Sequence, residues 1–220
     1  MVDSPRPGEK PLLKLGLTGG IASGKSAVGE MFVKLGAHLI QADAVAHALM
    51  QPGGGVYEEV VRRFGREILN SDGTINRSLL AEAAFGKPGG APPRVKELNE
   101  IVHPAVIEHE NTWMEDIGRR DPNAIAIVEA ALILESSAAE RFDCLIVVTC
   151  RPEQRIARFA QRLGISDDSA RVEVGRRMAA QIPDEEKIEA ADFVIDNSGS
   201  LDETERQVQR VFTELRSARV

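Results

Sequence analysis

The sequence predicts an α/β fold with a five-stranded, mostly parallel sheet covered by helices on both faces. Short apolar runs alternate with helical segments along the 220 residues, a pattern typical of such sheets. A glycine-rich turn joins the first apolar run to the first helical segment, and a long, mostly helical stretch separates the second run from the third. With 43% hydrophobic and 28% charged residues, the composition is that of a globular protein with a sizeable core.

The expected elements follow in order from these signals. The first run ends at glycines, and the segment 25–36 places Val28, Met31, Phe32 and Leu35 at helical spacing before a glycine stop. The five expected strands are residues 12–18, 37–42, 124–130, 144–150 and 192–196. Residues 43–123 are far longer than a simple crossover and predict an inserted helical subdomain.

Charge and cysteine content exclude several classes of protein. The formal net charge of -7 argues against nucleic-acid binding through a general basic field. Cys144 and Cys150 fall at the two ends of one expected strand, too far apart to pair, which is typical of a reducing, cytoplasmic setting. We find no stretch apolar enough for a membrane span or secretory signal, and we expect residues 1–11 to be a flexible tail.

The segment "GLTGGIASGKSAVGE" contains the strongest motif of the chain. Gly19, Gly24, Lys25 and Ser26 fit the pattern G-x-x-x-x-G-K-[ST] between an expected strand and an expected helix. In that setting backbone amides and the helix N-terminus bind phosphate oxygens, the lysine reaches the outer phosphates, and the serine can ligate magnesium. The alternative is a glycine-rich turn with an exposed lysine. The motif therefore predicts nucleotide phosphate binding.

An acidic residue follows the second expected strand. The chain lacks the N-K-x-D pattern of a guanine-binding GTPase, whereas a small-molecule kinase needs an acid near the acceptor hydroxyl. Asp43 lies where an open α/β sheet binds ligands and could accept the hydroxyl proton or hold magnesium through water. It could equally be the N-cap of the following helix. His47, four residues on, shares its helical face and could be a partner of that cap.

Arginines concentrate between residues 151 and 177. The segment contains seven arginines and four acidic residues, so it is basic within an acidic chain. Arg155, Arg158 and Arg162 share one helical face, as expected for a lid that offers guanidinium groups to triphosphate oxygens. The alternative is a solvated helix with ion pairs.

Taken together, these residues resemble the dephospho-coenzyme A kinase family over nearly the whole chain, from about Leu15 onward. The opening "LTGGIASGKSAVGEMFVKLGAHLIQADAVAH" is similar to the family's phosphate loop and aspartate-containing turn, and matches Asp43 and His47. "INRSLLAEAAF", "LNEIVHPAV" and "VEAALILE" resemble further family segments and carry Arg77, His103 and Glu135. "RFAQRLG", "RMAAQ" and "ADFVIDNSG" are similar to the lid arginine, the glutamine helix with Gln181, and the adenine-side strand end with Asn197.

The resemblance implies a P-loop kinase with three α/β/α layers, in which ATP phosphorylates the ribose 3′-hydroxyl of dephospho-coenzyme A with Mg²⁺, giving coenzyme A and ADP. It implies a single kinase domain at 12–220, with a helical acceptor region at about 50–123 and a lid at about 155–185. The implied catalytic residues are Lys25, Asp43 and Arg162, the last assisted by Arg158, Arg176 or Arg177. The implied nucleotide-binding residues are Gly20, Ile21, Ala22, Ser23, Gly24, Lys25, Ser26, Ala27 and Asn197, with Ser26 as metal ligand. The implied acceptor-binding residues are Asp43, His47, Arg77, His103 and Glu135.

Other interpretations stay open at this point. Gln41, Ala27 and Ala131 depart from the family pattern, and Gln41 leaves Asp43 as the one carboxylate of its turn. His103 could simply precede a helix opened by Pro104. The chain could be another small-molecule kinase, of nucleoside monophosphate or shikimate type, or an ATP-binding switch without phosphotransfer. No pattern encodes the oligomeric state.

Overall fold

The structure, a computed structural model, describes residues 12–86, 93–136, 138–179 and 181–217. The predicted flexible tail, residues 1–11, lies outside the described residues. The described chain divides into two compact units. The first contains the residues up to Ile40 and those from Met114 onward, and the second contains Gln41–Trp113.

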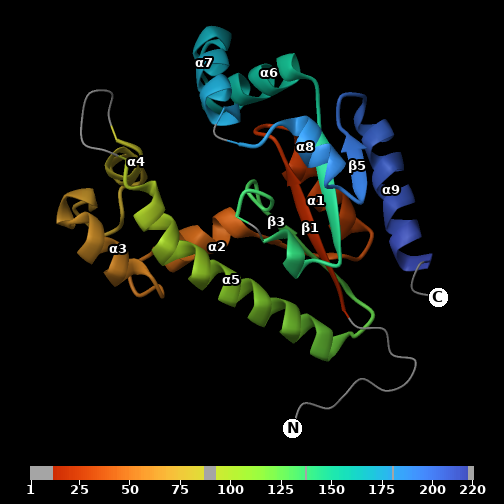
Figure 1. Cartoon of the computed structure of the whole chain (residues 1–220), viewed down its shortest axis with the longest axis horizontal. Coiled ribbons are helices and arrows are strands. Elements are labelled where there is room, and N and C mark those ends of the chain that lie inside the picture. Colours follow the sequence, from red (N-terminus) through yellow and green to blue (C-terminus); the bar gives the residue numbers. More distant parts are fainter. Residues whose placement is uncertain (1–11, 87–92, 137, 180, 218–220) are drawn as a thin grey trace. The chain divides into compact units, whose positions relative to one another are not determined.

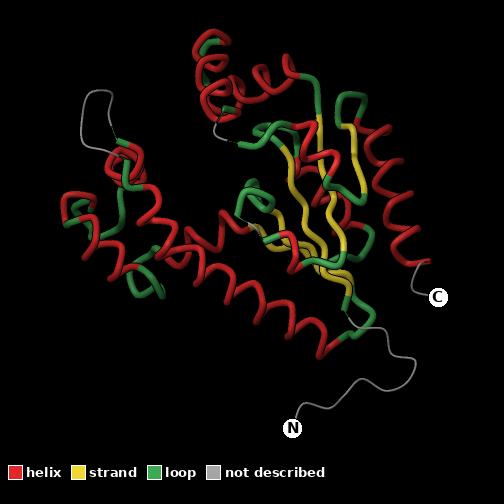
Figure 2. Tube along the Cα trace, viewed as in Figure 1, coloured by secondary structure: helices red, strands yellow, loops and turns green. Residues whose placement is uncertain are grey.

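One sheet with strand order β2-β3-β1-β4-β5 forms the centre of the first unit (Figure 2). The central strand β1 pairs in parallel with β3 and β4, and β4 pairs in parallel with β5. The five predicted strands are confirmed to within one residue at each end. Their bounds are β1 Leu13–Gly19, β2 His38–Gln41, β3 Ile125–Glu129, β4 Cys144–Thr149 and β5 Phe193–Asp196.

Nine α-helices lie in the described residues (Figure 1). Those of the first unit are α1 Lys25–Lys34, α6 Pro152–Leu163, α7 Asp167–Met178, α8 Asp184–Glu189 and α9 Leu201–Ser217. Those of the second unit are α2 Ala42–Leu49, α3 Tyr57–Phe64 and α4 Arg77–Phe85. Helix α5, Val95–Arg120, contributes residues to both units, and two short 3₁₀ turns are η1 Arg66–Ile68 and η2 Ala139–Arg141.

The larger core of the first unit lies between the sheet and helices α1 and α9. Leu15 and Leu17 of β1 are fully buried there against the apolar faces of the two helices. Phe32 of α1 and Phe212 of α9 have ring centroids 6.5 Å apart. A smaller cluster with Val147 and Ile133 covers the other face. Because β1 is buried on both faces, its apolar run is nearly continuous, as expected of a central parallel strand.

The second unit has its own buried residues. Val60 and Phe64 on one face of α3 are buried, and the Arg94 guanidinium lies 4.5 Å from the Phe64 ring centroid. Arg94 also forms an ion pair with Glu97, with Nε and Oε1 2.8 Å apart. Hydrogen bonding from Arg94 lowers the pKa of Glu97 to about 2. The start of α5 is thereby connected to α3.

Two further sequence expectations concern the cysteines and the membrane. Cys144 and Cys150 are free, as predicted, and both are buried. Across the described ranges, each helix is too short or too polar to span a bilayer.

The parallel direction of the strands indicates where a ligand-binding site can form. In a parallel sheet the carboxyl ends of all strands meet at one edge, where ligands bind in open α/β folds. Gly19, Glu129 and Asp196 are the last residues of β1, β3 and β5. The motif predicted to bind phosphate therefore starts at the same edge as two carboxylates.

Candidate active site

A tight loop connects the end of β1 to the start of α1. Its backbone enters the left-handed region at Gly24, with φ 98°, and at Ala22, with φ 53°. Gly24 has no room for a side chain, because an added Cβ would overlap the Asn197 amide. The Ser23 amide donates to the Gly20 carbonyl at 3.3 Å, which closes the turn. The loop thus lies at the N-terminus of a ten-residue helix, where the helix dipole favours an anion.

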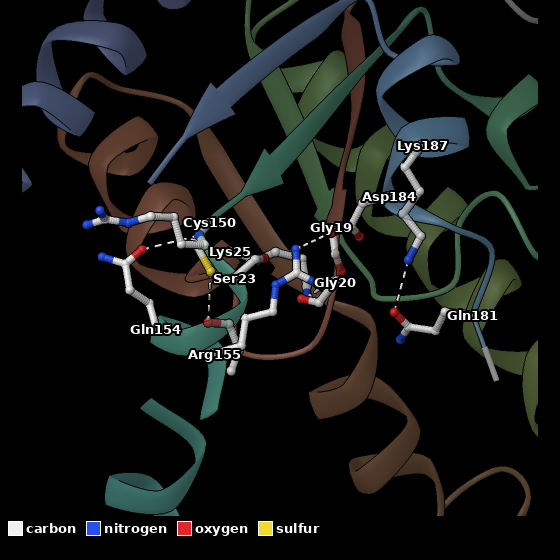
Figure 3. A network of polar contacts seen from close by, with 12 residues as sticks. Gly19, Gly20, Ser23, Lys25, Cys150, Gln154, Arg155, Gln181, Asp184 and Lys187 are labelled. Atoms are coloured by element: carbon white, nitrogen blue, oxygen red, sulfur yellow. Dashed lines mark hydrogen bonds and ion pairs between the residues drawn. The ribbon is translucent and has the colours of Figure 1, made fainter. Parts of the chain in front are cut away.

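Lys25 folds back over this loop. Its ammonium group donates to the carbonyls of Gly19 at 3.0 Å and of Gly20 at 3.2 Å. The positive charge therefore lies at the beginning of the loop, close to the backbone of the residues predicted to bind phosphate (Figure 3). A mobile ammonium on a four-carbon stem can exchange such carbonyl partners for phosphate oxygens.

Ser26 and Glu129 form a pair that the sequence analysis missed. The Ser26 hydroxyl donates to Glu129 Oε1 at 2.7 Å, and Glu129 is 8% exposed at the end of β3. A hydroxyl and a carboxylate are the hard oxygen ligands that Mg²⁺ prefers, so the pair fits a magnesium ion that also binds nucleotide phosphates. Among the described residues there is no cluster of three His, Cys, Asp or Glu side chains that could hold a metal without such help. The sequence shows only an acid at the end of an apolar run, and the pairing of that run with β1 is known from the structure.

Asn197, which follows β5, and Arg158 of α6 both hydrogen-bond to the loop. Asn197 is buried, and its side-chain amide donates to the Ser23 carbonyl at 2.9 Å. Arg158 donates to the same carbonyl at 3.2 Å and to the Asn197 carbonyl at 2.9 Å. Cys150 is also close, with its Sγ 3.8 Å from the Ala22 carbonyl oxygen. Asn197, predicted to bind nucleotide, thus contacts the phosphate loop itself.

The predicted lid is a hairpin of α6 and α7. Phe159 is its buried centre, and the guanidinium groups of Arg162 and Arg177 each lie 5.3 Å from the centroid of that ring. Arg176 and Arg177 both pair with Glu173, and the Arg176 hydrogen bond lowers the pKa of Glu173. Within the described residues no hydrogen bond joins Arg162 to the phosphate loop. Of the predicted lid arginines, Arg158 is the one that hydrogen-bonds to the loop in the described structure.

Glu135 belongs to a second polar cluster of the first unit. Its Oε1 lies 3.3 Å from Nζ of Lys187, which is 1% exposed, and accepts from the Ile182 amide at 3.2 Å. Lys187 also donates to Gln181 at 2.9 Å. Glu135 Oε2 is buried without a hydrogen-bond partner in the described structure. The cluster unites the predicted residues Glu135 and Gln181 through Lys187, which the sequence analysis did not identify.

Asp43 and His47 lie on α2 in the second unit. Gln41, not Asp43, is the N-cap of this helix, so the capping alternative for Asp43 was wrong. Asp43 instead lies in the first turn and is exposed. The alternative for His47, that it is a partner of an Asp43 cap, is wrong as well, because Asp43 is not the cap. The His47 ring instead contacts Gln51, with 3.2 Å between their Nε2 atoms, where a hydrogen bond depends on the tautomer.

A small pocket of about 110 Å³ opens beside His47 and Arg77. Arg77 is the first residue of α4, whose N-cap Asn76 accepts from the amides of Ser78 and Leu79. The pocket lining mixes polar groups with a larger apolar surface. Its residues are His47, Met50, Gln51, Ile75, Arg77, Leu80, Ala81, Phe85 and Leu98.

His103 lies in the interior of α5. Pro104 does not open a new helix, because α5 continues through it to Arg120. The alternative that His103 merely precedes a helix was therefore wrong. Proline has no N–H, so it cannot donate to the carbonyl four residues earlier. Partial burial lowers the pKa of His103.

The comparisons with known proteins agree with one another. A family model described as dephospho-CoA kinase matches residues 13–203. The dephospho-CoA kinase of Geobacter metallireducens is 39% identical over 203 residues, covering 92% of this chain and 96% of its own. That of Aquifex aeolicus is 38% identical over 202 residues, covering 92% and 97%.

Solved structures give the same result. The structure of TT1252 from Thermus thermophilus has a TM-score of 0.74 and 32% identity, covering 94% of this chain and 99% of its own. A dephospho-CoA kinase from Campylobacter jejuni has a TM-score of 0.58 and 25% identity, covering 92% and 96%. These similarities extend over both compact units rather than over the phosphate loop alone.

Proposed function

Because this chain belongs to the dephospho-CoA kinase family, we infer that it transfers the γ-phosphoryl group of ATP to the ribose 3′-hydroxyl of dephospho-coenzyme A, giving coenzyme A and ADP. One observation in the structure supports this function best. The loop 19–26 combines left-handed glycine geometry, the Lys25 ammonium and the Ser26–Glu129 pair at the carboxyl edge of the sheet. That combination serves a triphosphate and has no evident use in a purely structural turn.

The loop binds the donor. The backbone amides of residues 20–26 and the Lys25 ammonium hold the β- and γ-phosphates, aided by the dipole of α1. Arg158 and Asn197 keep the Ser23 carbonyl in place, so the loop is shaped before ATP arrives. Ala27 follows Ser26 in the first turn of α1 and, with Ile21 and Ala22, completes the nucleotide-binding segment.

Ser26 and Glu129 would hold the magnesium ion. The hydroxyl would bind the metal, and the Glu129 carboxylate, 2.7 Å away, orients that hydroxyl and adds negative charge. When bound, magnesium would neutralise part of the negative charge of the phosphates. Arg162 of the lid hairpin neutralises charge on the transferring group.

The second unit binds the acceptor. Asp43 orients or deprotonates the attacking hydroxyl, a role open to an exposed carboxylate that caps no helix. His47 and Arg77 line a pocket whose lining also includes Met50 and Phe85, which suits an acceptor that is part polar and part apolar. His103 contributes a further acceptor contact. Glu135 is a proposed acceptor-binding residue on the strength of the family resemblance alone. The free cysteines Cys144 and Cys150 favour a reducing, cytoplasmic setting.

A direct assay tests this function. The purified chain is mixed with ATP, Mg²⁺ and dephospho-coenzyme A, and the product is identified by mass. We expect coenzyme A and an equal amount of ADP, together with acceptor-dependent ADP release that is absent with shikimate or nucleoside monophosphates. Nucleotide binding without transfer to dephospho-coenzyme A would refute the function and favour a switch protein. Lys25→Ala serves as the inactive control.

A further inference from the structure

Arg155 is a buried cation beside the phosphate loop that has no role in the function argued so far. It lies on α6, one turn before Arg158, yet only 1% of its side chain is exposed. Its Nη2 pairs with Asp184, the first residue of α8. Its Nε and Nη1 are buried and have no hydrogen-bond partner in the described part of the chain. A guanidinium group in this state is costly and calls for an explanation.

The loop residue next to this guanidinium is Gly20. A Cβ built on Gly20 would overlap Nη1 of Arg155, and the guanidinium carbon is also within 3 Å of it. The φ of Gly20 lies outside the left-handed region, so its backbone would accept any residue. Gly20 therefore has to be glycine because of Arg155. Figure 3 shows Arg155 reaching the loop beside Lys25, whose ammonium binds the Gly20 carbonyl at 3.2 Å.

The ion pair fixes the position of Arg155. A free arginine tip would swing away from a new side chain at little cost, but this one is enclosed and paired with Asp184. Moving it would leave a buried charge without its partner, which is strongly unfavourable. The guanidinium group is thus held in place and limits how far the backbone at Gly20 can move toward it.

We propose that Arg155 is a positioning residue of the ATP site, held by Asp184, that fixes the phosphate loop at Gly20. This inference rests on the function proposed above and adds a determinant of ATP affinity outside the loop. A loop already held in its binding geometry needs no reordering when phosphates bind. For groups that act in catalysis, a displacement of about 1 Å can lower the rate by up to about a hundredfold. Arg155 acts through the loop backbone rather than through contact with ATP.

Arg155→Met separates positioning from a structural role. Methionine keeps the length of the side chain and removes a buried charge with two unsatisfied donors, so we expect thermal stability to be unchanged or higher. Asp184, 27% exposed, can then be solvated. We expect the KM for ATP to rise about tenfold, with the KM for dephospho-coenzyme A unchanged. Arg155→Lys, which can still pair with Asp184, should recover part of the affinity.

Gly20→Ala tests the contact itself. Alone, it should raise the dissociation constant for ATP about tenfold or more, because the methyl group meets the fixed guanidinium. Combined with Arg155→Ala, which removes the obstacle, it should cost little beyond Arg155→Ala alone. The matched control is Arg119→Met on α5, an exposed arginine paired with Asp116, which should change none of these values.

The outcomes are decisive in either direction. A wild-type KM for ATP in Arg155→Met, or strictly additive losses in the Gly20→Ala and Arg155→Ala cycle, would overturn the proposal. ATP binding is measured by calorimetry without acceptor, so the cycle can be read even if dephospho-coenzyme A proves not to be the acceptor. Failure of the proposed function would instead appear as wild-type protein that binds ATP and forms no coenzyme A.

Discussion

Replacing Asn197 by alanine should weaken both the fold and ATP binding. The side chain is buried and makes two hydrogen bonds, one to the phosphate loop and one to α9. Its side-chain Nδ2 donates to the Ser23 carbonyl at 2.9 Å, and its side-chain Oδ1 accepts from the Thr204 hydroxyl at 3.0 Å. Alanine removes both bonds and leaves the backbone bonds of residue 197 intact.

The loss in free energy of unfolding depends on which hydrogen bonds the two partner groups keep. The Ser23 carbonyl keeps Arg158 as a donor at 3.2 Å, and the Thr204 hydroxyl keeps the Ser200 carbonyl at 3.3 Å. Neither partner becomes fully unsatisfied, so each lost bond costs about 1 kcal/mol rather than the full burial penalty. With some lost packing, we expect about 2–3 kcal/mol in total. For a chain of this length that is a fall in Tm of about 4–12 °C.

Urea unfolding and calorimetric ATP titration measure the two effects. The dissociation constant for ATP should rise several-fold, because the Ser23 carbonyl is held less firmly. Thr204→Val removes one of the two bonds and leaves the buried side-chain oxygen of Asn197 without its donor, so it should cost about 1–3 kcal/mol. Asn76→Ala, which removes the N-cap of α4, should cost about 1 kcal/mol and leave ATP affinity unchanged. Stability of Asn197→Ala within about 0.5 kcal/mol of wild type would refute the reasoning.

Four further predictions concern the site. Lys25→Ala should lower kcat/KM about 10²–10³-fold, because the ammonium serves both bound ATP and the transition state; steady-state kinetics with near-normal values would disprove the phosphate-loop assignment. Asp43→Asn should bind ATP normally by calorimetry and lose about 10²–10⁴-fold in kcat; retained turnover would exclude its role at the hydroxyl. Glu129→Gln should raise the Mg²⁺ concentration for half-maximal activity about 10–100-fold, with exposed Glu153→Gln as control; an unchanged requirement would remove Glu129 from the metal site. Burial lowers the pKa of His103, so its contribution to stability is present above about pH 6.5 and is lost as pH falls through the folded-state pKa; His103→Gln should reduce the fall of the urea midpoint below about pH 6.5, and an unchanged pH dependence would contradict this.

The sequence alone predicted the parts of the site that local signals encode. A glycine-rich motif between a strand and a helix is read over a few residues, and loop 19–26 forms where it was expected. Glu129 was missed because one acid at the end of an apolar run has no local signature. Its role depends on the pairing of β3 with β1. That pairing brings Glu129 Oε1 to 2.7 Å from Ser26 Oγ, although the two residues are 103 positions apart in the sequence.

The arginines show the same limit more sharply. Helical spacing placed Arg155, Arg158 and Arg162 on one face and predicted a common role. In the structure Arg155 is buried, Arg158 binds the Ser23 carbonyl, and Arg162 is exposed over Phe159. Periodicity gives the direction of a side chain from its helix axis. What lies in that direction is decided by the packing of distant segments, so three equivalent positions acquire three environments.

Helix α8 explains why such environments escape local analysis. With six residues it is too short to be stable alone, and its sequence is strongly polar. Asp184 and Lys187, one turn apart, pair with Arg155 of α6 and with Glu135, which follows β3. Both cations are 1% exposed, so each is buried only because its acid comes from another segment. A polar stretch that a sequence pattern assigns to the surface can therefore contribute to the ion pairs of two buried cations, and only the tertiary fold distinguishes the two cases.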